Sequence, residues 1–225
     1  MNRTLLTSLV AFLVVAPEPL SLCAESRHDF AKWEKDISAY EQLDRTSPTP
    51  KGGLLFIGSS TIRLWKTLAQ DFPKHQVINR GFGGSEIVDA THFADRIIFP
   101  YRPKAIFLRA GGNDLWAGKS PEQVFADFKD FVREIHAKLP DTEIVFISLS
   151  PSIARLQQAA KEKAVNESVR DFTQRTARLK FIDTYDMVLG SDGKPRPELF
   201  VEDKLHFSAA GYKLLAERVR AYLPK

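Results

Sequence analysis

A short apolar run that stops abruptly at a glycine and two serines constrains this chain most. Residues 54–57 read Leu-Leu-Phe-Ile, with glycines on both sides. Such a run is typical of a strand buried on both faces, as in a parallel sheet. We expect a helix to begin at Ser59 or Ser60, which places a hydroxyl beside free backbone N–H groups. Its apolar face would contain Ile62, Leu64, Trp65 and Leu68. Alternatively, one of the serines only caps this helix.

Strand-like and helix-like segments alternate along the rest of the chain. Further strands are predicted at residues 77–79, 105–108, 143–148 and 180–183, and helices at 87–98, 121–139, 155–178 and 209–223. The spacing of Phe30, Trp33, Ile37 and Tyr40 indicates another amphipathic helix before the first strand. This alternation predicts an α/β fold, in which a five-stranded parallel sheet with right-handed crossovers lies between two layers of helices.

Three polar loops come directly after predicted strands. They are the turn at 58–60, the loop at 81–85 and the loop at 111–114. Ligands of parallel α/β sheets bind beyond the carboxyl ends of the strands. All three loops should therefore meet at one edge of the sheet.

Hydrolysis of an ester by a serine needs a base, a carboxylate that orients the base, and N–H donors for the oxyanion. Of the five histidines, only His206 lies between the last predicted strand and the last helix. Asp203 precedes it by three residues, so a tight turn would present both side chains to one cavity. The backbone of Gly84, the amide of Asn113 and the N–H of Ser60 are candidate oxyanion donors. Taken singly, each of these residues also fits an ordinary loop or turn.

Four segments together resemble the SGNH hydrolases, also called GDSL-type esterases and lipases. They are residues 58–61 (Gly-Ser-Ser-Thr), 79–84, 111–114 (Gly-Gly-Asn-Asp) and 203–206 (Asp-Lys-Leu-His). The resemblance runs from about Leu54 to the C-terminus and implies the flavodoxin-like fold of that family. It assigns the nucleophile to Ser60, the oxyanion donors to Ser60, Gly84 and Asn113, and the final pair to Asp203 and His206.

The sequence departs from the family pattern at two places. Ser59 and Thr61 stand where the family has aspartate and leucine, so the choice between Ser59 and Ser60 depends on position alone. Gly83 and Gly84 are adjacent, so either N–H could be the oxyanion donor. There is no Gly-x-Ser-x-Gly elbow of the other large hydrolase class.

The resemblance implies a serine esterase that acts through an acyl-enzyme. Because no lid insertion separates the motifs, we expect short, acetyl-type acyl groups on carbohydrate or another small polar alcohol. The alternatives are a lysophospholipase or lipase, and a non-catalytic carbohydrate-binding protein on the same scaffold. Such a binding module would have no need for both Asp203 and His206.

The first 24 residues have the layout of a secretory signal peptide. Arg3 precedes an apolar run at residues 5–16, and a stretch of small residues ends at Ala24. The run is shorter than the ~20 residues of a membrane span. We expect cleavage after Ala24 and export to the periplasm or the medium. Lipid anchoring at Cys23, the only cysteine, is the alternative.

We therefore predict three segments: a signal peptide at 1–24, an N-terminal helix and linker at 25–52, and the hydrolase domain at 53–225. The net charge is only +4, and the basic residues are scattered among acidic ones, which does not favour nucleic acid as a partner. The histidines are scattered and the mature chain has no cysteine, so we expect no metal and no cofactor. The oligomeric state is left open.

Overall fold

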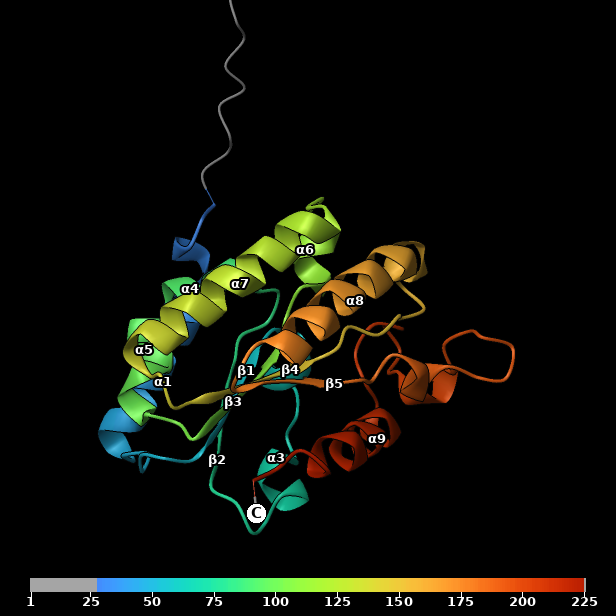
Figure 1. The fold of residues 1–225 in the computed structure, drawn as a ribbon. Helices are drawn as coiled ribbons and strands as arrows, with labels where there is room; N and C mark the ends of the chain where they lie inside the picture. The colour runs from blue at the N-terminus through green and yellow to red at the C-terminus, as the bar shows by residue number, and fades with distance from the viewer. Residues whose placement is uncertain (1–27, 225) are drawn as a thin grey trace, which may run out of the picture.

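A five-stranded parallel sheet forms the centre of the structure, a computed structural model that describes residues 28–224 (Figure 1). The expected signal peptide and Cys23 lie outside the described residues. The strand order is β2-β1-β3-β4-β5, and every pair is parallel. The strands are β1 (Leu54–Gly58), β2 (Val77–Gly81), β3 (Ala105–Arg109), β4 (Glu143–Ile147) and β5 (Leu179–Ile182). The predicted fold class is thereby confirmed.

Helices lie on both sides of this sheet (Figure 1). The α-helices are α1 (Glu34–Thr46), α2 (Ser60–Arg63), α3 (Leu68–Asp71), α4 (Ile87–His92), α5 (Ala94–Ile97), α6 (Gly112–Trp116), α7 (Pro121–Lys138), α8 (Ala159–Arg175) and α9 (Ala209–Arg220). Within residues 28–224, no helix has the length and apolar character needed to cross a membrane.

Alternate residues of each strand point to opposite faces and so build two cores. From β1, Leu55 and Ile57 join the core beneath α4, α5, α7 and α8. Leu54 and Phe56 join the other core, beneath α2, α3 and α9. Burial on both faces explains why the strand reads as an unbroken apolar run.

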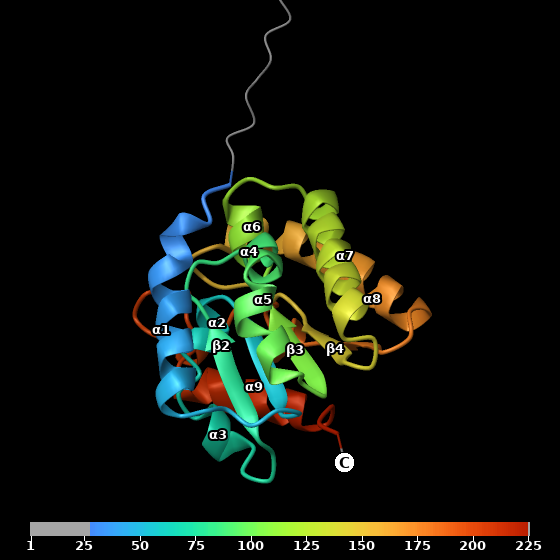
Figure 2. The same cartoon turned by 90° about the vertical axis from the view of Figure 1, so that its left-hand side faces the viewer.

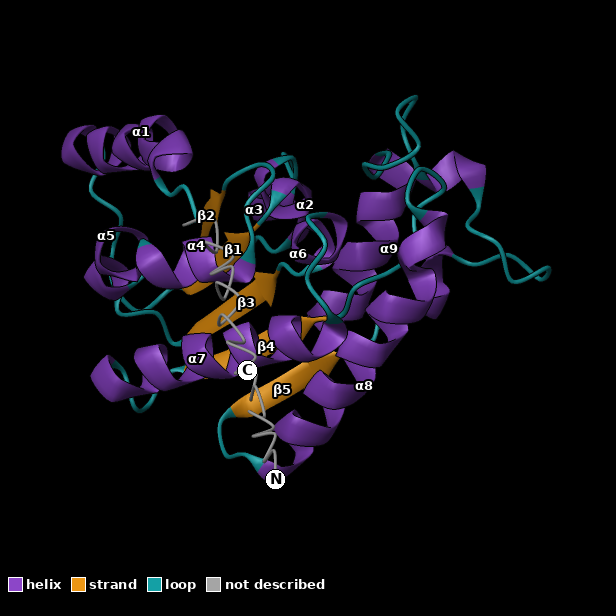
Figure 3. Ribbon diagram, turned by 90° about the horizontal axis from the view of Figure 1, so that it is seen from above, coloured by secondary structure: helices purple, strands orange, loops and turns teal. Residues whose placement is uncertain are grey.

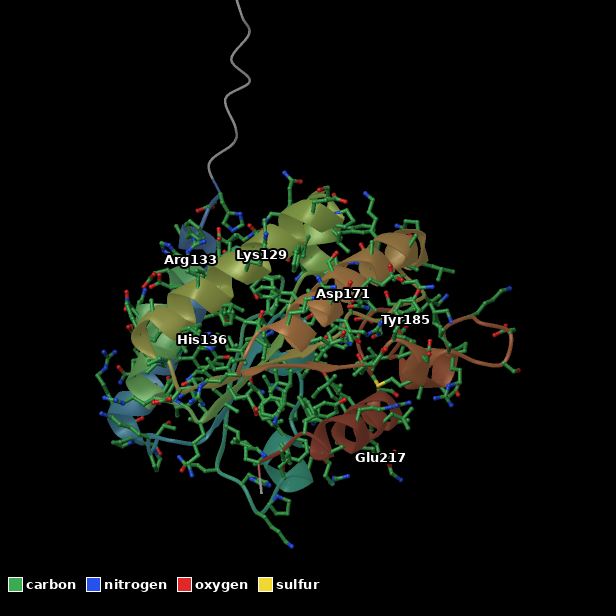
Figure 4. All side chains as sticks on the ribbon, viewed as in Figure 1. Lys129, Arg133, His136, Asp171, Tyr185 and Glu217 are labelled. Carbon is green, nitrogen blue, oxygen red and sulfur yellow. The ribbon has the colours of Figure 1, made fainter. Side chains whose placement is uncertain are left out.

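The outer faces of the covering helices carry charged side chains. Lys129 and Arg133 of α7 and Glu217 of α9 are exposed to solvent (Figure 4). The inner face of α7 supplies Val124, Phe128 and Ile135 to the core. This division is the amphipathic pattern that predicted the helix.

The helix α1 packs beside the sheet and is fixed by both packing and charge (Figure 2). Ile37 is fully buried in the core beneath the helices. Arg96 of α5 binds Glu34 at 2.7 Å and Glu41 at 2.7 Å. The predicted boundary between the N-terminal segment and the hydrolase domain falls between residues 52 and 53. Helix α1 ends before this boundary and β1 begins after it. The division of the chain into these segments stays a prediction.

Two predicted helices are interrupted in the structure. The helix expected after Ser60 is two short helices, α2 and α3, separated by a turn. Asp71 accepts hydrogen bonds from Trp65 Nε1 (2.6 Å) and Thr67 Oγ1 (2.7 Å), and these bonds hold the turn. Ile62, Trp65 and Leu68 are nevertheless buried, as expected from the pattern. The helix predicted at 87–98 is divided into α4 and α5 at Phe93, whose ring is buried.

The strands are seen side by side from above in Figure 3, in the order given above. Gly58 closes β1 and pairs in register with Arg109 at the end of β3. A Cβ atom at Gly58 would lie 2.1 Å from the carbonyl oxygen of Arg109, and its φ is +134°. Only glycine fits here, so the chain can leave the sheet directly into Ser59 and α2.

Candidate active site

Ser60, His206 and Asp203 are in hydrogen-bond contact at the carboxyl edge of the sheet. Ser60 is the first residue of α2, and its Oγ lies 2.9 Å from His206 Nε2. The other ring nitrogen, His206 Nδ1, lies 2.5 Å from Asp203 Oδ2. The structure thus brings together three side chains from two segments that are far apart in sequence.

A tight turn presents Asp203 and His206 to the same place. Asp203 Oδ1 accepts hydrogen bonds from the backbone N–H groups of Leu205 and His206, both at 2.9 Å. Lys204, the residue directly after Asp203, has a left-handed backbone conformation with a φ of +58°. Burial acts to raise the pKa of Asp203, but the hydrogen bonds from the His206 ring and from the two N–H groups lower it to about 2. Asp203 is therefore a carboxylate at any pH at which the enzyme would work.

The ionised carboxylate fixes the tautomer of the imidazole. A carboxylate can only accept hydrogen bonds, so His206 Nδ1 carries the proton of the neutral ring. Nε2 is then an acceptor, and the Ser60 hydroxyl donates to it. This arrangement can remove a proton from Ser60 as the oxygen attacks an electrophile.

Three backbone N–H groups at the cavity in front of Ser60 have no partner within residues 28–224. The N–H of Ser60, at the start of α2, makes no hydrogen bond with any described residue, and the same holds for Gly83 and Gly84. All three residues line the cavity in front of Ser60. Ser59 differs, because its N–H donates to the carbonyl of Arg109 at 3.1 Å. Its side chain makes no hydrogen bond within residues 28–224.

The amide of Asn113 is fixed from both ends. Its Nδ2 donates one hydrogen to the carbonyl of Ser85 at 3.0 Å, and its Oδ1 accepts from Arg155 Nη1 at 2.9 Å. Since Arg155 can only donate, the amide nitrogen must point away from it. The second Nδ2 hydrogen remains available to a ligand in the cavity, which Asn113 lines.

Asp114 connects this loop to α4. It is fully buried, and its Oδ1 accepts from the N–H of Ile87 at 3.2 Å and lies 3.4 Å from Lys119 Nζ. Burial raises the pKa of Asp114 to about 6, although the charge of Lys119 and the N–H of Ile87 act to lower it. The contact holds the loop with Asn113 against the loop with Gly84.

The cavity in front of Ser60 has a volume of about 260 Å³. This is just below the ~300–1,000 Å³ usual for small-molecule sites. Much of its wall is polar, including Ser150, Ser152, Arg155, Gln158 and Glu162, while Leu149, Phe200, Leu205 and Phe207 supply apolar surface. A small, mostly polar molecule fits such a space best.

Two opposite charges are buried in this wall without an ion pair between them. Arg109 is 7% exposed and donates to the Ser148 carbonyl and to Ser150 Oγ (2.8 Å). Burial lowers its pKa to about 10, although the charge of Glu162 opposes this. Glu162 is 4% exposed, and burial raises its pKa to about 7. Its Oε1 accepts from Gln158 Nε2 at 2.9 Å, and its Oε2 has no partner among the described residues.

The sequence analysis did not identify the polar residues of the cavity wall, namely Arg109, Arg155, Gln158 and Glu162. Arg109 ends a predicted strand, and Arg155, Gln158 and Glu162 fall in a segment predicted as one polar helix from 155 to 178. In the structure, Arg155 lies in the loop before a 3₁₀ turn at Leu156–Gln158, and α8 begins at Ala159. One signal in the sequence indicated that Arg109 would lie near the site: it comes shortly before the loop at 111–114, which was predicted at the carboxyl edge of the sheet.

The structure places a serine, a histidine and an aspartate in hydrogen-bond contact at the carboxyl edge of a parallel sheet, the arrangement typical of serine hydrolases. The sequence model of the GDSL-like lipase/acylhydrolase family matches residues 58–214, and the chain belongs to this family. It is therefore a carboxylic ester hydrolase. The comparison with curated sequences gives no match.

Solved structures share the fold at low sequence identity. A protein from Streptococcus pneumonia described as a platelet activating factor has 23% identity and a TM-score of 0.77, over 86% of this chain and 94% of that one. A GDSL-like lipase from Bacteroides thetaiotaomicron has 15% identity and a TM-score of 0.69, over 86% and 98%. A catalytic mutant of an acetylxylan esterase from Geobacillus stearothermophilus has 18% identity and a TM-score of 0.62, over 78% and 96%.

Proposed function

We propose that the protein is a serine esterase that removes short, acetyl-type acyl groups from carbohydrate or other small polar alcohols. The observation that carries this proposal is the hydrogen-bonded chain from Ser60 Oγ through His206 to Asp203. The small volume and polar wall of the cavity support a short acyl group and a polar alcohol. An acetylxylan esterase among the structural neighbours is consistent with this substrate class.

In the proposed reaction, Ser60 Oγ attacks the acyl carbonyl and its proton passes to His206 Nε2. Asp203 holds the imidazole and stabilises the imidazolium that forms. The N–H groups of Ser60 and Gly84 and the amide of Asn113 donate to the oxyanion. His206 then gives the proton to the departing alcohol oxygen, which leaves an acyl-enzyme. Water, deprotonated by His206, attacks the acyl carbon. The bond between that carbon and Ser60 Oγ then breaks, His206 returns the proton to Ser60, and the carboxylic acid is released.

An acyl-length series tests the substrate class. We expect 4-nitrophenyl acetate and acetylated oligosaccharides to be hydrolysed with the highest kcat/KM, and the value to fall as the acyl chain lengthens. A maximum at octanoyl or longer esters would favour the lipase alternative. Binding of acetylated sugars without any turnover would favour the non-catalytic alternative.

Ser59 and Ser60 provide a matched pair for identifying the nucleophile. Ser60→Ala should remove acyl-enzyme formation, whereas Ser59→Ala should keep substantial turnover because the Ser59 side chain makes no hydrogen bond within residues 28–224. Labelling with a fluorophosphonate, followed by peptide mapping, reports the modified serine directly. A label on Ser59, or full activity in Ser60→Ala, would show that the nucleophile is wrongly assigned.

We also propose that the protein is exported, with cleavage after Ala24. The charged start, apolar run and small-residue end of the first 24 residues support this. Intact-mass measurement of the protein recovered from a secreting host tests it. A mature mass that still contains Met1 would contradict the proposal, and a mass increase at an N-terminal Cys23 would indicate lipid anchoring instead.

A further inference from the structure

Three arginines line the cavity in front of Ser60, and within residues 28–224 none of them forms an ion pair with a carboxylate. They are Arg63 of α2, Arg109 at the end of β3 and Arg155 before α8. The ion pairs that arginines form among residues 28–224 all involve other arginines. Buried or half-buried charges are normally paired in proteins. Arg155 is half-buried with no ion pair among the described residues, and the exposed Arg63 and the buried, hydrogen-bonded Arg109 add further positive charge, so the cavity wall suits an anionic ligand.

Arg63 lies at the oxyanion loop. An ideal Cβ at Gly83 would be 2.7 Å from both Nε and Nη2 of Arg63, so the guanidinium lies directly against the glycine backbone. A larger residue at position 83 would displace it. The side chain is exposed, and it projects one helical turn after Ser60. Arg63 and Ser60 line the same cavity, so the guanidinium adds a positive charge to the wall of that cavity.

Arg155 is held at the same cavity with most of its donors unused. One N–H, from Nη1, binds Asn113, and the guanidinium lies 4.8 Å from the centre of the Trp116 ring. The Trp116 ring packs against the guanidinium, while the remaining N–H groups have no protein partner among residues 28–224. A planar guanidinium with free donors suits the bidentate binding of a carboxylate or phosphate.

Glu162 is the only carboxylate in the part of the cavity wall that the structure describes. Burial raises its pKa to about 7, so much of the population is uncharged at neutral pH. One carboxyl group cannot neutralise three guanidinium groups, and Glu162 forms no ion pair with an arginine within residues 28–224; Arg109 and Arg155 act on it only through their charge. The charged side chains that line the cavity therefore carry more positive than negative charge.

We propose that this cavity binds an anionic group on the alcohol half of the substrate, a carboxylate or a phosphate, through Arg63 and Arg155, with Arg109 as a buried positive charge behind them. The inference rests on the proposed function, because it concerns the alcohol half of an ester substrate. An acetyl-type acyl group carries no charge, so the anionic group would belong to the alcohol. It narrows the substrate from polar alcohols in general to acylated alcohols that are acidic.

Matched substrate pairs test the anion directly. One pair is O-acetylgalacturonic acid and O-acetylgalactose, which share a sugar ring and differ in the carboxylate. The other is acetylglycerol 3-phosphate and acetylglycerol. We expect the anionic member of at least one pair to have about tenfold higher kcat/KM in dilute buffer. Preference in the first pair would assign a carboxylate, and in the second a phosphate. The preference should shrink in 0.5 M NaCl, because salt screens exposed charges.

Arg63→Gln is the variant for this test, because the side chain is exposed and its loss should not prevent folding. It should reduce the preference for the anionic member about fivefold or more. Arg218→Gln, at an exposed arginine of α9 outside the cavity, is the control and should leave the preference unchanged. Thermal melting curves of both variants establish that they are folded.

The two proposals fail in different ways. If the wild-type protein does not hydrolyse 4-nitrophenyl acetate or any of the four acetyl esters, the proposed function is wrong. If it hydrolyses them and both members of each pair have equal kcat/KM, the anion site is wrong and the esterase stands. An anionic preference that is identical in Arg63→Gln and in the wild type would likewise overturn the site.

Discussion

Replacing Glu162 by glutamine should change how the stability of the protein depends on pH. The side chain is 4% exposed, and the charged and titratable groups nearest to it are Arg109 of β3, Arg155 before α8, and Tyr185. Burial raises the pKa of Glu162 from 4.5 to about 7. Glutamine has nearly the same shape, keeps an acceptor for Gln158 Nε2, and cannot ionise in this range.

The sign follows from proton linkage. Between pH 4.5 and 7 the unfolded chain has released the Glu162 proton and the folded chain still holds it. The unfolded state therefore binds fewer protons, and the free energy of unfolding falls as pH rises. The stabilising effect is complete below pH 4.5 and is lost as pH passes through about 7. A pKa difference of about 2.5 corresponds to between about 3 and 4 kcal/mol at about 1.4 kcal/mol per pKa unit.

Urea unfolding of the wild type and Glu162→Gln from pH 4 to pH 8.5 measures this effect. The difference in unfolding free energy, variant minus wild type, should rise by about 3 kcal/mol over that range. Asp114, whose pKa burial raises to about 6, is present in both proteins and cancels. Glu167→Gln, at an exposed position of α8, should show a nearly constant difference. A constant difference for Glu162→Gln would mean that Glu162 is ionised in the folded protein at ordinary pH.

Three further outcomes follow from the proposed mechanism. Asn113→Ala should lower kcat for 4-nitrophenyl acetate about 100- to 1,000-fold, because one oxyanion donor is lost, and a KM effect alone would contradict that role. Asp203→Asn should lower kcat about 10⁴-fold, since the amide favours the wrong tautomer of His206; activity within tenfold of wild type at pH 7 would refute this. Every step of the proposed mechanism uses only protein groups and water, so turnover should persist in excess EDTA, and a loss of activity that zinc or calcium restores would refute metal independence.

The sheet and the edge that holds the site could be predicted from the sequence. Residues 54–57 gave a buried strand because they are apolar on both faces, and the loops at 58–60, 81–85 and 111–114 were placed together because parallel strands end at one edge. The assignments of Ser60, Asp203 and His206 as catalytic residues stay predictions. The structure adds that their side chains are within hydrogen-bond distance.

The features that the sequence did not predict depend on side-chain contacts and on how segments meet in space. A periodic apolar pattern could not reveal the break between α2 and α3, because that turn is held by the side-chain hydrogen bonds of Asp71. The position of Arg155 depends on the length of the loop before α8. Nothing local to residue 155 indicates that it will bind Asn113, 42 residues earlier.

The arginine contacts also link the two proposals physically. Arg155 donates to Asn113, the amide that would stabilise the oxyanion, and lines the cavity proposed for the anion, with its remaining N–H groups unpartnered among residues 28–224. A bound anion would hold the guanidinium in place and, through it, the orientation of the Asn113 amide. Part of the binding energy of the anionic group would then favour the transition state, which raises kcat as well as lowering KM. The preference for an anionic substrate should therefore appear in kcat, whereas an anion bound far from Asn113 would change KM alone.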